Sequence, residues 1–109
     1  MPNSPAFIRI KADVLSIVRD VPRGRVCTYA AIGRHPDVMA RHVAYILATL
    51  TDAERPGVPW HRVVAESGAL NRIAHGRGAE QRAALEAEGG AVTPKGVVAD
   101  LAGVVWSPG

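Results

Sequence analysis

Few side chains in this sequence have the chemistry of a nucleophile or a metal ligand. Cys27 is the only cysteine, so the chain has no internal disulfide, and no histidine adjoins this thiol to activate it. We therefore expect Cys27 to be a buried structural residue. The histidines have no cysteine pair that would complete a zinc site, so we expect neither a metal nor another cofactor. They are spread along the chain at His35, His42, His61 and His75.

The densest group of functional side chains is the run Pro59-Trp60-His61-Arg62-Val63-Val64. The indole of Trp60 is a hydrogen-bond donor only and is no nucleophile at neutral pH. Its large flat ring can still stack on another flat or apolar group. The run therefore offers an aromatic surface beside a histidine and an arginine, and it contains no nucleophile of the cysteine or serine type.

Basic side chains are concentrated in the first three quarters of the chain. The net charge is +3, and residues 1–82 hold twelve of the thirteen Lys and Arg against seven Asp and Glu. Eleven of the thirteen are Arg, whose guanidinium forks onto phosphates and base edges. This asymmetry favours a polyanionic partner, although a solvated basic surface would have the same composition.

Helical spacing of apolar residues predicts a helix over 4–20, capped by Ser4. Thr28 can cap a second helix that ends near Gly33, and Asp37 can cap a third that reaches Leu50. These two helices predict a helix-turn-helix over about 28–50, with Arg34 in the turn.

The remaining segments predict a small β element and one more helix. We expect a loop over 51–58, a strand ending the run 59–64, a turn at 67–68 and a helix over 80–88 that Gly89 ends. In the tail, 90–109, we expect Trp106 to dock on the core. The fold is thus predicted to be mostly α with a small β element, in one domain over 1–109. The lack of a membrane-spanning run or signal core predicts a cytoplasmic protein.

The run 59–63 resembles the Pro-Cys-His-Arg-Val signature of the O6-alkylguanine-DNA alkyltransferases, with Trp60 in place of the reactive cysteine. Further similarity follows in the same order and extends over about residues 7–89. It includes Val21-Pro22-x-Gly24-x-Val26-x-Thr28-Tyr29, Ala40-Arg41-x-Val43, Ser67-Gly68 and Leu85-x-x-Glu88-Gly89. Tryptophan at this position is the mark of the alkyltransferase-like proteins. The resemblance implies a winged helix-turn-helix DNA-binding domain like the C-terminal domain of the alkyltransferase.

The same resemblance implies a function without catalysis. His61 and Glu88 match the residues that support the thiolate, so they are remnants of the relay. Arg41 matches the arginine that fills the hole left by a flipped nucleotide, and Tyr29 matches the tyrosine that presses on a phosphate. The implied DNA contacts are Thr28, Tyr29, Arg34 and Arg41, and the implied lesion pocket is formed by Tyr29, Pro59, Trp60 and Arg72.

The expected partner is double-stranded DNA containing O6-alkylguanine, bound through its minor groove by a monomer that flags the site for nucleotide excision repair proteins. If the source is bacterial, we expect association with the nucleoid. Two departures concern the docking: Ala44 and Tyr45 replace glycines after the arginine, and Thr51-Asp52 replaces an asparagine.

Two alternatives remain open from the sequence. One is an active transferase that uses Cys27, and the other is a winged-helix regulator that reads undamaged sequence, usually as a dimer.

Overall fold

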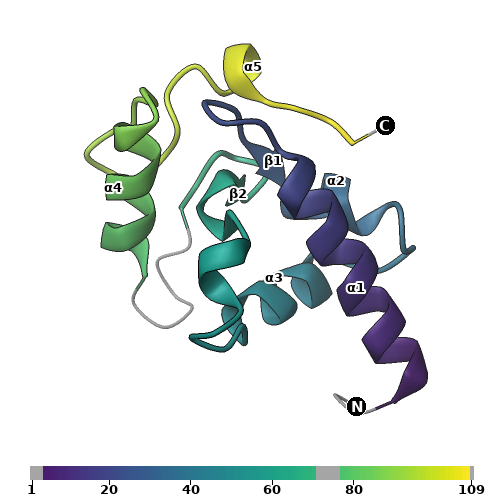
Figure 1. Cartoon of the computed structure of the whole chain (residues 1–109). Helices are drawn as coiled ribbons and strands as arrows, with labels where there is room; N and C mark the ends of the chain where they lie inside the picture. The colour runs from purple at the N-terminus through teal and green to yellow at the C-terminus, as the bar shows by residue number, and fades with distance from the viewer. Residues whose placement is uncertain (1–3, 71–76, 109) are drawn as a thin grey trace.

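The computed structural model describes residues 4–70 and 77–108 and is mostly helical with one two-stranded sheet, as predicted. The sheet lies near the centre, between α1 and α4 (Figure 1). None of the helices in these residues is long and apolar enough to cross a membrane. The elements are α1 Pro5–Asp20, β1 Cys27–Thr28, α2 Tyr29–Gly33, α3 Ala40–Ala48, η1 Arg55–Gly57, η2 Trp60–Arg62, β2 Val63–Val64, α4 Gly78–Ala87 and α5 Leu101–Val104, where η marks a 3-10 helix.

α1 begins and ends as the sequence predicts. The side chain of Ser4 accepts a hydrogen bond from the N–H of Phe7 at 3.1 Å, and Pro5 occupies the first helical position, where its missing N–H costs nothing. The helix buries one face, formed by Val14, Leu15 and Val18.

α2 and α3 form the predicted helix-turn-helix, but one of the two predicted caps is wrong. The hydroxyl of Thr28 accepts the N–H of Ala31 at 3.1 Å and so caps α2 as expected. Asp37 does not cap α3, because its backbone has a left-handed φ of 58° and Met39 is the N-cap. Asp tolerates this left-handed conformation better than most residues, so Asp37 bends the turn instead of capping the helix.

The turn between α2 and α3 is too tight for a side chain at Gly33. The N–H of Val38 donates to the carbonyl of Gly33 at 2.8 Å, which folds the chain back at once. A Cβ atom at Gly33 would lie 2.4 Å from the carbonyl oxygen of Val38. A glycine here therefore fixes how closely α3 can follow α2.

The predicted strand over 59–64 is only partly correct. β2 is limited to Val63–Val64, which pairs in parallel with β1. The residues before it form η2, in which the N–H of Arg62 donates to the carbonyl of Pro59 at 3.0 Å. A hydrogen bond of 2.7 Å from the N–H of Trp60 to the carbonyl of Val58 tightens the entry to this turn. The signature is thus a tight turn that feeds a short strand.

The C-terminal tail docks on the start of β1, and it contains the short helix α5, which we did not predict. Val26 donates its N–H to Val104 at 3.0 Å and accepts the N–H of Trp106 at 2.7 Å. The side chain of Trp106 packs against the core, as predicted. α4 extends over Gly78–Ala87, and Gly89 follows it with a φ of 88°, in keeping with its predicted role as a terminator.

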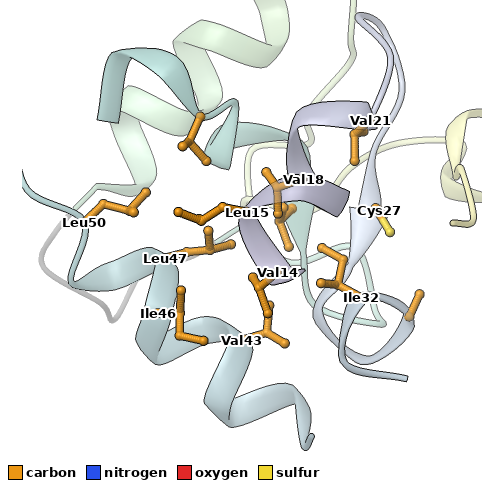
Figure 2. Close-up of a cluster of buried hydrophobic side chains, with 13 residues drawn as sticks. Val14, Leu15, Val18, Val21, Cys27, Ile32, Val43, Ile46, Leu47 and Leu50 are labelled. Carbon is orange, nitrogen blue, oxygen red and sulfur yellow. The ribbon is translucent and has the colours of Figure 1, made fainter. Parts of the chain in front are cut away.

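Two apolar clusters meet at β2. Val63 belongs to the larger one and Val64 to the smaller one, because successive strand residues face opposite sides. The larger cluster joins α1, α2 and α3 (Figure 2). Its fully buried side chains include Val14, Val18, Ile32, Val43 and Ile46, and the smaller cluster consists of Val26, Val64, Leu70, Leu85 and Val98.

Candidate nucleic-acid interface

Glu88 directly follows α4, and its carboxylate forms hydrogen bonds with two residues of η2. Arg62 donates to it twice, from Nε to Oε1 at 3.0 Å and from Nη2 to Oε2 at 2.6 Å. His61 Nε2 lies 2.9 Å from the same Oε2. The remaining Nη1 of Arg62 donates to the carbonyl of Val21 at 2.9 Å, so the network also reaches the end of α1.

This network sets the charge on Glu88 and the tautomer of His61. The two hydrogen bonds from Arg62, with a smaller contribution from His61, lower the pKa of Glu88 from 4.5 to about 2, although burial opposes the shift. Only 8% of the Glu88 side chain is exposed. An ionised carboxylate can only accept hydrogen bonds, so Nε2 of His61 must carry a proton. The negative charge of Glu88 is therefore balanced by Arg62 whatever the protonation state of the imidazole.

Trp60 lines an open cavity of about 820 Å³. Its indole is half-buried against the larger apolar cluster and meets the His61 ring edge-on, with centroids 6.4 Å apart. The cavity has walls of mixed charge, because Arg55 pairs with Asp52 at 2.8 Å along one side. Its lining consists of Arg19, Asp52, Arg55, Pro56, Gly57, Val58, Pro59, Trp60, His61, Arg62 and Glu80.

The predicted DNA-contacting residues lie on the helix-turn-helix and do not line this cavity. Arg41 is exposed in the first turn of α3, and it has no hydrogen-bond or ion-pair partner within residues 4–70 and 77–108. Arg34 is exposed at the end of α2, and Thr28 uses its hydroxyl as a cap. Tyr29 is half-buried against the same apolar cluster as Trp60. Arg72, the fourth predicted pocket residue, lies outside the described residues.

Comparison with known proteins identifies the family. Residues 9–90 match the model of the 6-O-methylguanine DNA methyltransferase DNA-binding domain. The chain belongs to that family. No curated protein matches it.

Two solved structures share the fold of this methyltransferase-family domain. One is S. pombe Atl1 in complex with damaged DNA containing O6-carboxymethylguanine, with 29% identity and a TM-score of 0.78. The other is S. pombe ATL in complex with DNA, with 30% identity and a TM-score of 0.77. Each comparison covers 93% of this chain and 97% of the other. The fold is therefore the winged helix-like fold of the alkyltransferase-like proteins, as the resemblance implied.

Gln81 positions the methyltransferase-family signature, and sequence analysis missed it. This side chain is fully buried on α4 and donates to the carbonyl of Val63 at 2.8 Å and to that of His61 at 3.2 Å. Gln81 lies in α4 and Glu88 directly follows it seven positions later, about two helical turns on, so both side chains face η2. This seven-residue spacing is the only sign in the sequence that Gln81 and Glu88 act together. It could be interpreted only after the structure placed α4 against η2.

The thiol of Cys27 is poorly suited to nucleophilic chemistry. Its side chain is fully buried in the larger apolar cluster, and its Sγ approaches the carbonyl oxygen of Thr28 at 3.7 Å. Burial raises the pKa of this thiol to about 11. At pH 7 only about one such thiol in ten thousand is ionised.

Proposed function

We propose that this protein recognises O6-alkylguanine in double-stranded DNA, flips the base out through the minor groove and holds it beside Trp60 without transferring the alkyl group. The observation that carries the proposal is the position of the Trp60 indole. It lies within the residues that match the DNA methyltransferase family, in the run that resembles the enzyme signature, and it lines an open cavity large enough for a nucleobase. S. pombe Atl1, which shares the fold, was solved with DNA containing O6-carboxymethylguanine.

The absence of alkyl transfer follows from the chemistry of the two candidate acceptors. Transfer requires an electron pair that attacks the alkyl carbon, and the indole nitrogen of Trp60 has none available at neutral pH. The thiol of Cys27 is buried and protonated. The protein therefore acts as a binder of the lesion and not as an enzyme.

Arg41 is the residue that replaces the flipped base in this proposal. Extrusion of a base costs a few kcal/mol of stacking and pairing, and this cost is smaller for a poorly paired lesion. Arg41 is exposed and makes no ion pair with the described residues, so none of their ion pairs has to break when it enters the duplex. Its guanidinium can donate hydrogen bonds to the unpaired cytosine.

The decisive experiment compares two duplexes that differ only in one O6-methylguanine. We expect tighter binding to the damaged duplex, and we expect Arg41→Ala to weaken that complex most. Arg9→Ala is the matched control, since Arg9 is also exposed and unpaired among the described residues but lies on α1. Equal affinity of the wild type for both duplexes would refute the proposal.

Base capture beside Trp60 has its own optical signal. The chain has only two tryptophans, so a Trp106→Phe variant leaves Trp60 as the sole indole. We expect its fluorescence to be quenched by the damaged duplex and to change less with the undamaged one. An identical response to both duplexes would show that the base does not reach Trp60.

The proposal extends to the cellular context implied by the family resemblance. The bound lesion is handed to nucleotide excision repair proteins, and the protein acts as a cytoplasmic monomer, associated with the nucleoid if the source is bacterial. Size-exclusion chromatography with light scattering tests the monomer, with and without DNA. Epistasis between loss of this protein and loss of excision repair, measured as survival after alkylation, tests the handover.

A further inference from the structure

Tyr45 is an exposed aromatic residue on the same helix as Arg41. The described residues include four exposed large apolar side chains, and Tyr45 is the only aromatic one, with 51% of its surface accessible. It lies four positions after Arg41 in α3, a rise of about 6 Å along the helix. Within the described residues its hydroxyl has no hydrogen-bond partner. Packing within the protein therefore covers only about half of this side chain and leaves the rest open to a partner.

The helix geometry places Tyr45 and Arg41 on one face. α3 buries Val43, Ile46 and Leu47, and positions 41 and 45 project from the opposite side of the helix. Long side chains in a helix lean toward its N-terminus, so the ring of Tyr45 covers the turn that carries Arg41. Any partner that receives Arg41 therefore meets Tyr45 as well.

The ring of Tyr45 is held in place by α1. Phe7 contacts it edge-to-face, with centroids 6.4 Å apart and an interplanar angle of 72°. Two grooves flank this pair, a mostly apolar one of about 400 Å³ and one of about 530 Å³ whose lining also includes Lys11 and Glu54. Such an edge-to-face pair restrains the ring before any partner binds, which reduces the entropy lost on binding.

The charges around Tyr45 favour a polyanion. α3 contains Arg41 and no acidic residue, and the acidic Glu54 in the groove beside Tyr45 is paired with Lys11 at 2.9 Å. Tyrosine hydroxyls are among the groups that donate hydrogen bonds to DNA phosphates, and an aromatic ring can pack on deoxyribose. We propose that Tyr45 is a second DNA contact of α3, with its ring on a deoxyribose and its hydroxyl donating to a phosphate of the groove that Arg41 enters. This inference rests on the proposed function.

In this proposal Tyr45 contributes to the affinity for any duplex, and Arg41 contributes the preference for damaged DNA. Phosphate and sugar contacts position a protein on DNA and carry no information about the base. Tyr45 therefore strengthens binding to damaged and undamaged duplexes alike. Arg41 acts only where a base leaves the stack, so it supplies the preference for the lesion.

The test measures the affinity of Tyr45→Ala and Tyr45→Phe for the damaged and undamaged duplexes by fluorescence anisotropy. We expect Tyr45→Ala to weaken binding to both about tenfold, and Tyr45→Phe about threefold through the lost hydroxyl, with the ratio of the two affinities unchanged. Ile8→Ala is the control, because Ile8 is an exposed apolar residue on α1 and should leave both affinities unchanged. Thermal unfolding followed by circular dichroism verifies that each variant is folded.

If the wild type prefers the damaged duplex, any one of three results would overturn the inference about Tyr45. One is unchanged or tighter binding by Tyr45→Ala, which would leave the apolar surface to a protein partner. Another is a loss confined to the damaged duplex, and the third is an equal loss in Ile8→Ala. If the wild type instead binds both duplexes equally, the proposed function fails, yet a loss on both duplexes in Tyr45→Ala still supports the contact.

Discussion

Replacing Glu88 by Gln removes the negative charge that Arg62 and His61 share and keeps the size of the side chain. Arg62 makes two hydrogen bonds to this carboxylate, of 3.0 and 2.6 Å, and the side chains of Arg62 and Glu88 are only 15% and 8% exposed. The pKa of Glu88 falls from 4.5 to about 2 on folding, which corresponds to at most about 3 kcal/mol of stability at neutral pH. Since Gln still accepts one hydrogen bond, we expect Glu88→Gln to cost about 1–3 kcal/mol.

The pH dependence of this loss identifies its cause. Because the pKa of Glu88 is lowered in the folded protein, its contribution is complete above pH 4.5 and is lost as the pH falls through about 2. The difference in stability between wild type and Glu88→Gln should therefore shrink over this interval. Glu54 titrates in the same range, since the N–H of Thr51 and then Lys11 lower its pKa to about 2, but it does so in both proteins and cancels.

Urea unfolding of wild type and Glu88→Gln at pH 7, 4 and 2.5 is the measurement. Glu86→Gln is the matched control. Glu86 lies in α4, two positions before Glu88, and its exposed side chain has no partner among the described residues. It should change stability by less than about 0.5 kcal/mol. A loss in Glu88→Gln that stays constant down to pH 2.5, or one no larger than that of Glu86→Gln, would refute the electrostatic reasoning.

Two further variants and one labelling experiment test other parts of the fold. Gln81→Leu leaves two carbonyls of the signature without their donor, so we expect a loss of about 2 kcal/mol in urea unfolding and a weaker preference for damaged DNA. Cys27 should react with iodoacetamide at pH 8 only as fast as the protein unfolds, and intact-mass spectrometry should show no added methyl group after incubation with methylated DNA. Gly33→Ala should lower stability by about 1–3 kcal/mol in thermal unfolding, because its Cβ would lie 2.4 Å from a backbone oxygen of Val38.

The features predicted correctly from the sequence are those whose signals are local. Ser4 and Thr28 lie directly before helices, and each caps the helix that follows through a side chain of its own. The error at Asp37 shows where local signals fail. An aspartate before an apolar run can cap a helix or occupy a left-handed turn, and the turn closed by Gly33 decides between the two.

The features missed by the sequence depend on contacts between distant segments. In the sequence Gln81 is an ordinary polar residue of a helix. In the structure α4 packs on η2, so the Gln81 side chain is fully buried and donates hydrogen bonds to the carbonyls of His61 and Val63. The turn at Trp60 was missed for a different reason, because its backbone hydrogen bonds, from Trp60 to Val58 and from Arg62 to Pro59, are local and the β-branched end of the run favoured a strand. The family resemblance predicted the family correctly, but the geometry of the run 59–64 required the structure.

The network of Glu88, Arg62 and His61 is electrostatically complete without a thiolate at position 60. The proposed function places Trp60 where the enzyme signature has its cysteine, whose thiolate would add a second negative charge near the carboxylate. Here the charge of Glu88 is already matched by two hydrogen bonds from Arg62, and His61 donates its own proton to the same carboxylate. No member of the network depends on an acceptor at position 60. The network therefore anchors the end of α4 to η2 and keeps Trp60 at the edge of its cavity, a role that the proposed function needs and that requires no alkyl transfer.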